Sequence, residues 1–281
     1  MSLPELPLWC RVILLILAIC SFLPQILRFQ TKQTTNGVSS LYVLWNLIHA
    51  TEQLTIYIYF MFTEGEPDGT IFLHSPPSTG DRFSLWHCAV VAMLFLTLFA
   101  QVLLYSDRSS RIALVAGYTS FLLVSIIPLI SDAISQIDYE ARRFWSAVFF
   151  ALHCMLIYPI LTAIGVWGIY RQAREISAVP FPNALSLQSL AMQAVVFTLV
   201  SVTWIYCLPF PYEKIDRQRD LNWTAFSVWY GAIGWIIIDS FIFALGQAVL
   251  LLLALHRSSS SKVTTQRGSE TEPLLGHEAQ E

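Results

Sequence analysis

The sequence predicts an all-α integral membrane protein, with seven transmembrane helices arranged as two parallel three-helix repeats joined by a linker helix. Three observations predict this fold class. The 281 residues are 55% hydrophobic and only 12% charged, which is about half the charged share of an ordinary soluble domain. Seven apolar runs are long enough to cross a bilayer. The second half of the chain also resembles the first half.

The apolar runs are predicted as helices because about 20 residues, at about 1.5 Å each, cross the roughly 30 Å of hydrocarbon in a bilayer. They cover residues 9–27, 41–62, 83–105, 112–131, 144–170, 185–208 and 223–255. The first run is interpreted as a retained helix rather than a signal peptide, because Glu5 precedes it without a Lys and Arg11 lies inside it. The last run is long enough to include an interfacial turn or a tilt.

The two halves of the chain align at an offset of 147 residues, without a gap over about fifty residues. Gln25 aligns with Gln172, and Asn46 aligns with Gln193. The short loops align as well, with Gly37-Val38-Ser39 on Ala184-Leu185-Ser186. This repeat predicts a first three-helix unit (1–105), a linker helix (106–140), a second three-helix unit (141–255) and a tail (256–281).

The charge distribution favours a lumenal N-terminus and a cytosolic C-terminus. With this orientation the cytosolic segments carry nine of the sixteen Lys and Arg residues, whereas the lumenal segments carry eleven acids. The net charge of −3 leaves no basic surface of the kind that neutralises phosphates. We therefore expect the lipid bilayer, and not nucleic acid, as the surrounding partner.

The tail, residues 256–281, contains no Phe, Tyr or Trp and is predicted to be disordered. Within it, Glu270, Leu274 and Leu275 fit the acidic dileucine pattern that clathrin-type coat adaptors bind in extended form. A pattern this short also arises by chance, so both interpretations stand. As a sorting signal it would direct the protein to a vacuole, a lysosome or another endomembrane.

The first loop carries a motif that points to a known family. Leu23-Pro24-Gln25, followed by Lys32 and Gly37-Val38-Ser39, resembles the first signature of PQ-loop repeat proteins. That family includes cystinosin, vacuolar basic amino-acid transporters and, more distantly, the SWEET sugar carriers. The resemblance covers both repeats, and it implies a seven-helix carrier that works by alternating access.

The resemblance also implies hinges at Pro24, Gln25 and Gln172. Pro24 removes a backbone donor near the cytosolic end of the first helix, and Gln25 can satisfy the carbonyl left unpaired there. An ordinary helix end explains Pro24 equally well. In the second copy Arg171 stands where the family has Pro, and Pro159 offers a different break point.

Two carboxylates lie inside predicted spans and are candidates for proton coupling. Asp239 is near the middle of the last run, where burying an ionised carboxylate costs at least about 2.5–3.5 kcal/mol, so it is expected to face a cavity. The resemblance to cystinosin implies an acid with this role in the seventh helix. Glu52 could serve as a second proton site or bind a cationic amine. Because it lies on the flank of its helix, contact with a neighbouring helix is equally compatible.

The second run is unusually polar. One face of it carries five polar side chains at helical spacing, namely Tyr42, Asn46, His49, Gln53 and Tyr57. Such a face is expected to line a water-filled path. We therefore expect a substrate-binding set of Asn46, His49, Gln53, Gln193 and Trp235, in which the repeat equivalents Asn46 and Gln193 face each other near the pseudo-two-fold axis. In proton-coupled members of the family an acid often stands at the position of Gln193, so facilitative transport remains an alternative.

The predicted function is transport of a small polar solute, such as an amino acid, with protons as the coupling ion. The five Cys and six His show no CxxC or HxxxH spacing, so we expect no disulfide framework, metal site, cofactor or enzymatic activity. Two alternatives remain open at this point. One is a non-transporting seven-helix sorting receptor, and the other is a lipid-handling PQ-loop protein.

Overall fold

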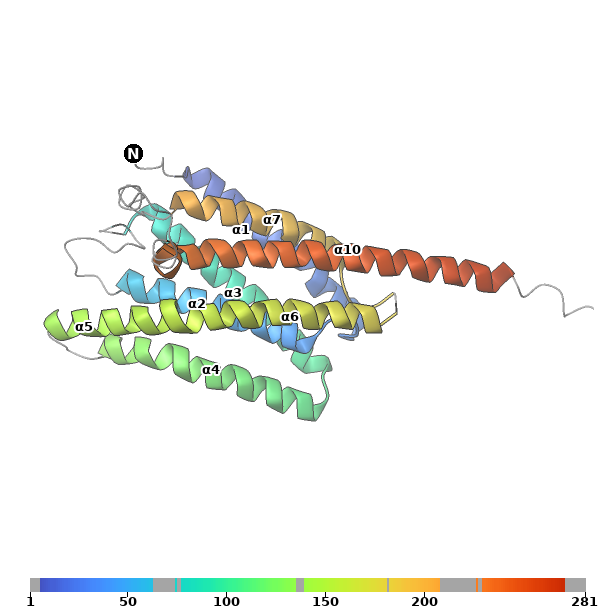
Figure 1. Cartoon of the computed structure of the whole chain (residues 1–281), viewed down its shortest axis with the longest axis horizontal. Coiled ribbons are helices and arrows are strands. Elements are labelled where there is room, and N and C mark those ends of the chain that lie inside the picture. Colours follow the sequence, from blue (N-terminus) through green and yellow to red (C-terminus); the bar gives the residue numbers. More distant parts are fainter. Residues whose placement is uncertain are drawn as a thin grey trace, which may run out of the picture.

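All regular structure in the described part of the chain is helical (Figure 1). The computed structural model describes residues 6–62, 74, 77–134, 139–180, 182–207, 226 and 229–270. In chain order the elements are α1 (Leu8–Lys32), α2 (Ser40–Phe62), α3 (Thr79–Tyr105), α4 (Arg108–Ile134), α5 (Tyr139–Phe150), the π-helix η1 (Ala151–Ile157), α6 (Tyr158–Ala178), α7 (Leu187–Cys207), the π-helix η2 (Tyr230–Gly234) and α10 (Trp235–Glu270).

Six stretches of helix are long and apolar enough to cross a membrane, which agrees with the predicted all-α membrane class. They are Leu8–Lys32, Thr79–Tyr105, Arg108–Ile127, Phe144–Ala178, Leu187–Cys207 and Trp235–Ser259. The stretch from Phe144 runs through α5, η1 and α6 without interruption. The helix α2 is as long as the others, but its polar face keeps it outside this set.

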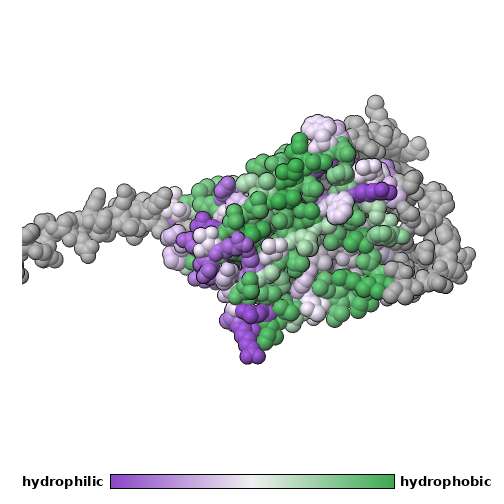
Figure 2. Space-filling view, turned by 180° about the vertical axis from the view of Figure 1, so that it is seen from behind, coloured by the Kyte–Doolittle hydropathy of each residue, from purple (hydrophilic) through white to green (hydrophobic). Residues whose placement is uncertain are grey.

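The outer surface of the described helices is largely apolar. Figure 2 shows hydrophobic side chains over most of the visible face, with hydrophilic ones gathered toward the end from which α10 projects. Large exposed hydrophobic residues occur on several helices, including Leu27, Trp86, Leu104, Val195 and Leu252. A water-soluble protein rarely exposes so much continuous apolar surface, whereas a lipid-facing one requires it.

The principal contacts between helices form a closed ring, in the order α1, α7, α10, α6, α2, α3 and back to α1. Within this ring α3 contacts both α1 and α2, and α10 contacts both α6 and α7. The remaining long helix, α4, packs on the outside of the ring against α2, at the edge of the bundle in Figure 1. The polar helix α2 is therefore enclosed between α3, α6 and α4, which explains how its polar face is kept from lipid.

Two glutamines join the beginning of α2 and of α7 to the opposite half of the ring. The Nε2 group of Gln25 donates to the carbonyl of Ala184 (3.0 Å), and its Oε1 accepts from the backbone N–H of Ser186 (2.8 Å). The Nε2 group of Gln172 donates to the carbonyl of Gly37 (2.8 Å), and its Oε1 accepts from the N–H of Ser39 (2.7 Å). We call these two sets the amide clamps.

The amide clamps obey the repeat found in the sequence. The two clamps exchange when each residue is replaced by its repeat equivalent, 147 positions away: Gln25 by Gln172, Ala184 by Gly37 and Ser186 by Ser39. The structure differs here from the expectation for Gln25, which was a bond to a carbonyl of its own helix. Both of its polar atoms are engaged across the ring instead.

The two loops held by the clamps cross at close range. Gly37 has a φ of 90°, and a Cβ at this position would lie 2.6 Å from Cγ of Asn183. Glycine meets both demands, since it adopts positive φ freely and has no side chain. Arg28 adds two bonds at the crossing, from Nε and Nη2 to the carbonyl of Asn183 (3.1 and 2.8 Å).

The helix boundaries differ from the prediction mainly at the C-terminal end. The predicted disorder begins at residue 256, but α10 continues to Glu270. No Pro or Gly interrupts this stretch before Gly268, and the hydroxyl of Ser259 donates to the carbonyl of Leu255, so the helix can continue past the apolar run. Of the predicted sorting signal, Glu270 is the last described residue, and Leu274 and Leu275 lie outside the described residues.

Candidate functional site

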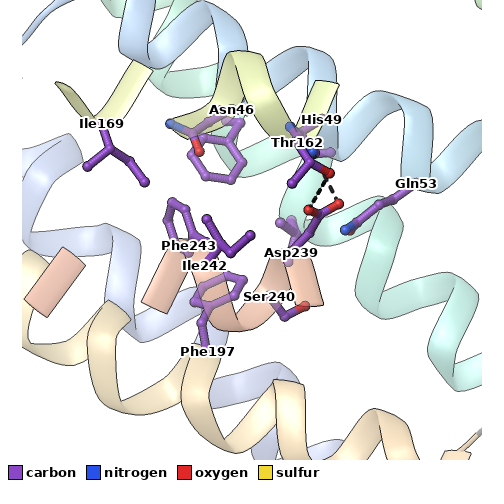
Figure 3. Close-up of a pocket in the computed structure, with 14 residues that line it drawn as sticks. Asn46, His49, Gln53, Thr162, Ile169, Phe197, Asp239, Ser240, Ile242 and Phe243 are labelled. Carbon is purple, nitrogen blue, oxygen red and sulfur yellow. Dashed lines mark hydrogen bonds and ion pairs between the residues drawn. The ribbon is translucent and has the colours of Figure 1, made fainter. Parts of the chain in front are cut away.

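A cavity with an empty volume of about 550 Å³, counting its open mouth, lies inside the helix ring (Figure 3). Side chains from α2, α3, α6, α7 and α10 line it. We call it the central cavity. Six of its lining residues are polar, namely Asn46, His49, Gln53, Thr162, Asp239 and Ser240. A cavity lined by a few convergent polar groups and an apolar remainder is typical of a site for a small molecule.

The carboxylate of Asp239 is the charged group of the central cavity. Its Oδ2 lies 3.2 Å from Nε2 of His49, and its Oδ1 accepts from the hydroxyl of Thr162 at 2.7 Å. Figure 3 shows these three side chains meeting from α2, α6 and α10. The Asp239 residue is 7% exposed, so the surrounding helices leave only a small part of it open to the cavity. This arrangement can take up a proton or bind a cationic group.

Two tyrosines support the polar side of the cavity from behind. The hydroxyl of Tyr158 accepts from Nε2 of Gln53 (2.8 Å), and its ring packs edge-on against His49 with centroids 5.4 Å apart. The hydroxyl of Tyr230 lies 3.2 Å from Oγ1 of Thr162. The sequence analysis missed both tyrosines. Tyr158 directly follows the π-helix η1 and Tyr230 begins η2, and such turns often occur at functional sites, but only the structure reveals them.

The opposite wall of the central cavity is aromatic. The rings of Phe95, Phe197 and Phe243 pack against one another, with centroids 5.8 Å apart for Phe95 and Phe243 and 4.7 Å apart for Phe197 and Phe243. The cavity therefore has one polar wall, supplied by α2, α6 and part of α10, and one apolar wall. This pairing suits a solute that has both a polar group and an apolar part.

The chemistry of the site does not follow the internal repeat. Subtracting 147 from Asp239 gives Ala92, and adding 147 to His49 gives Val196. The carboxylate and the imidazole thus have aliphatic counterparts in the other half. Among the described residues, the Asp239–His49 contact therefore has no repeat equivalent, whereas each amide clamp has one.

The predicted substrate-binding residues are only partly brought together. Asn46, His49 and Gln53 all line the central cavity, whereas Gln193 is buried and is not among the lining residues. Nδ2 of Asn46 donates to the carbonyl of Tyr42 in its own helix (2.8 Å). Trp235 packs behind the cavity wall, with its ring 4.3 Å from that of Tyr158.

The polar face of α2 continues at both ends of the central cavity. Toward the amide clamps, the hydroxyl of Tyr42 accepts from Nε2 of Gln247 in α10. In the other direction, Tyr57 is fully buried against Trp204, with ring centroids 6.0 Å apart. The two tyrosines predicted to line a path are thus packed between helices in this conformation.

Glu52 lies on another side of α2 and forms a second buried pair. Its Oε1 is 2.6 Å from Nδ1 of His153, and its Oε2 accepts from the hydroxyl of Ser125 at 2.6 Å. Both partners of Glu52 lie on other helices, since Ser125 belongs to α4 and His153 to η1, which is the helix-contact alternative; a proton-coupling role for Glu52 stays a prediction. Glu52 is not among the residues that line the central cavity.

Pro24 lies within α1, which continues as one helix from Leu8 to Lys32. The other predicted hinge residues, Gln25 and Gln172, are the side chains of the amide clamps. These three residues lie toward the clamped end of the ring and do not line the central cavity. A hinge role for them remains a prediction.

Comparison of the chain with family models, with curated proteins and with solved structures gives no match. The geometry of the central cavity is therefore the observation that bears on function.

Proposed function

We propose that this protein transports a small polar solute, such as an amino acid, across an organellar membrane by alternating access, with Asp239 as the proton site. The observation that carries the proposal is the position of Asp239. Its carboxylate lies in the wall of a cavity enclosed by the helix ring, next to His49 and Thr162. An ionisable residue placed within a membrane bundle and facing a cavity is typical of proton relays and ion pathways.

The coupling step follows from the contacts of Asp239. An ionised carboxylate attracts the amine of an amino acid or a protonated His49, and a protonated carboxyl does neither. Loading and releasing a proton at this atom therefore changes how strongly the cavity holds a cationic group. Gln53 and Asn46, on the same face of α2, supply amide groups that can orient the rest of a polar solute.

The proposed topology has seven spans, of which α2 is the polar one, in the order three, one and three. The helix contacts support it, since α3 lies between α1 and α2 as α10 lies between α6 and α7, and α4 remains outside. The amide clamps support the parallel repeat, because replacing every residue of one clamp by its repeat equivalent, 147 positions away, gives the other clamp. These features also support the resemblance to PQ-loop repeat proteins. With a cytosolic C-terminus, the clamped loops face the cytosol.

In this proposal the amide clamps form the cytosolic gate. Opening the ring at this end separates the α1–α2 loop from the α6–α7 loop, and it breaks the four hydrogen bonds of Gln25 and Gln172. Pro24 lies next to Gln25 within α1, at a point where the missing N–H weakens the helix. It is therefore the hinge about which the clamp would move.

The test is uptake into liposomes that contain the purified protein, with labelled amino acids and sugars, with and without an inward proton gradient. We expect gradient-driven uptake of one solute class, and we expect Asp239→Asn to reduce it by about tenfold or more, because an amide cannot carry the proton. Asp107→Asn is the matched control. It neutralises an exposed carboxylate in the connection between α3 and α4, away from the cavity, and should leave uptake unchanged.

The other outcomes separate the alternatives. Uptake that ignores the gradient and survives Asp239→Asn would contradict the proton site and indicate facilitative transport. No uptake of any solute by the native protein would contradict transport itself, and a non-transporting receptor or a lipid-handling protein would then be the better explanation. Sorting of the protein by Glu270, Leu274 and Leu275 is a separate prediction, which localisation of a Leu274→Ala, Leu275→Ala variant would test.

A further inference from the structure

A second cavity lies near the N-terminal end of α1, at the opposite end of the ring from the amide clamps. It has an empty volume of about 340 Å³, counting its open mouth, and is lined largely by α1, α3 and α7. We call it the Arg11 cavity. Its polar groups are those of Arg11, Ser84, His87 and Thr203, and its apolar wall includes Leu14 and Trp204.

Arg11 is buried, and the described residues supply it with no ion-pair partner. The residue is 8% exposed, and its Nη1 donates to the carbonyl of Gly80 (2.8 Å) and to the hydroxyl of Ser84 (2.9 Å). Its Nε is buried and has no hydrogen-bond partner in the described part of the chain. No carboxylate of the described residues lies within 4.0 Å of the guanidinium as an ion pair.

The acid at the start of α3 is already engaged elsewhere. Asp81 is buried, and its Oδ2 accepts from the backbone N–H of Ser78 (2.8 Å) and from the Ser78 hydroxyl (2.9 Å). The same carboxylate lies 3.1 Å from Nδ1 of His74. Asp81 therefore caps α3 and pairs with His74, and it forms no ion pair with Arg11.

The free edge of the guanidinium has the geometry that a carboxylate requires. The two hydrogens of Nη1 are used by Gly80 and Ser84, and the buried Nε–H has no hydrogen-bond partner among the described residues. Nε and Nη2 lie on one edge of the planar group and can donate two parallel hydrogen bonds to the two oxygens of a carboxylate. Such an anion would also offset the high cost of burying an unpaired cation.

We infer that the Arg11 cavity binds a small molecule through a carboxylate group held by Arg11. The cavity is open at its mouth, and Leu14 and Trp204 of its wall offer apolar contact to the remainder of the ligand. A small amino acid or a short organic acid has this combination of groups. The inference concerns binding at this site, and it does not depend on transport through the central cavity.

The test is thermal unfolding of the purified protein in detergent, with four probes at equal ionic strength: leucine, leucinamide, sodium hexanoate and sodium chloride. Leucine and leucinamide differ in the carboxylate, so they isolate the group that Arg11 is proposed to bind. We expect leucine and hexanoate to raise the unfolding midpoint in a saturable manner, and we expect leucinamide and chloride to leave it unchanged.

Three variants assign any response to the Arg11 cavity. Arg11→Lys should weaken the response to leucine by about tenfold or more, because an ammonium group cannot form the two parallel bonds. Arg28→Lys, which changes an arginine at the other end of α1, is the matched control and should keep the native response. Thr203→Phe fills the cavity from α7 without altering Arg11, so it decides the question if Arg11→Lys does not fold.

Several results would overturn the inference. Among them are no response of the native protein to leucine or hexanoate, and a response that survives both Arg11→Lys and Thr203→Phe. A chloride response that depends on Arg11 would also overturn it, in favour of an inorganic anion site. Because binding and uptake are measured separately, a lost uptake with an intact leucine response would contradict the transport proposal alone.

Discussion

Two carboxylate–imidazole pairs, each with one partner on α2, have the same chemistry and different surroundings. In the first, Asp239 and His49 are 3.2 Å apart, and their side chains are 6% and 16% exposed toward the central cavity. In the second, Glu52 and His153 are 2.6 Å apart, and both side chains are 0% exposed. Each carboxylate also accepts from one hydroxyl, that of Thr162 or of Ser125.

The difference indicates that a carboxylate in a membrane helix can either exchange a proton or solute with a cavity or hold neighbouring helices together. Asp239 is reached from a cavity, so a proton or a solute can come and go. Glu52 is sealed between α2, α4 and η1, and it attaches α4 to the outside of the helix ring. Sealing removes the route for proton exchange, while the short hydrogen bonds remain as a structural link.

Removing each carboxylate should separate the two roles most clearly. We expect Glu52→Ala to lower the free energy of unfolding by about 3–5 kcal/mol, because it strands a buried His153 and Ser125. Asp239→Ala should cost only about 1–2 kcal/mol, because water in the cavity can replace the lost contacts. Unfolding of both variants in detergent, followed by circular dichroism, measures the difference.

Glu52→Gln is the control for shape, since it keeps the side-chain volume and can still accept from Ser125. In liposomes it should also retain gradient-driven uptake per folded molecule. Equal destabilisation by Glu52→Ala and Asp239→Ala would contradict the distinction between the pairs. A loss of gradient-driven uptake in a well-folded Glu52→Gln variant would indicate that Glu52 also takes part in proton coupling.

Removing the hydroxyl donor of each pair tests the same contrast, with smaller expected changes in stability. Ser125→Ala should destabilise the protein by about 1–3 kcal/mol, because an oxygen of Glu52 is left buried without its donor. Thr162→Val should cost about 0.5–1.5 kcal/mol, because Asp239 borders the cavity. The order of the two unfolding free energies is the measurement, and the reverse order would show that the cavity-side bond is the more important one for stability.

The smallest effect is expected at a third carboxylate, which lies in water. Asp107 precedes α4 and accepts from the backbone N–H of Ser110 at 3.0 Å, and this bond lowers the pKa of Asp107 below its usual value of 3.8. Because the folded-state pKa is depressed, its contribution to stability is present above about pH 4 and is lost as the pH falls further. Stability measured from pH 6 down to pH 3 should show a shallower loss in Asp107→Ala than in the native protein, and identical pH profiles would contradict the cap.

Much of the fold could be predicted from local patterns. Apolar runs of sufficient length located the helices, and the offset of 147 residues identified Gln25 and Gln172 as equivalents. The offset could not reveal that each glutamine reaches the loop of the other half, because that contact depends on how the halves meet. The continuation of α10 past His256 was missed because a polar composition predicts exposure to water but does not show where a helix ends.

Site residues could be predicted from the sequence where a residue type is costly to bury in a membrane helix. They could not be predicted where tertiary packing determines the contact. Asp239 stood out because a carboxylate in an apolar run requires a cavity, and His49 and Gln53 followed from the spacing on α2. The partner of Glu52 could not be predicted, since His153 is brought to it by a π-helix about a hundred residues away in the chain. Arg11 was visible only as a charge in the first run, and its burial depends on Gly80 and Ser84 of another helix.

The amide clamps carry a consequence for how such a chain can be assembled. Each half supplies one glutamine and one receiving loop, so two identical half-length chains related by a two-fold axis would form both clamps at once. The contact is self-complementary in the manner of a homodimer interface. In the proposed arrangement of three, one and three spans, α4 joins the halves, and it contacts the ring from outside.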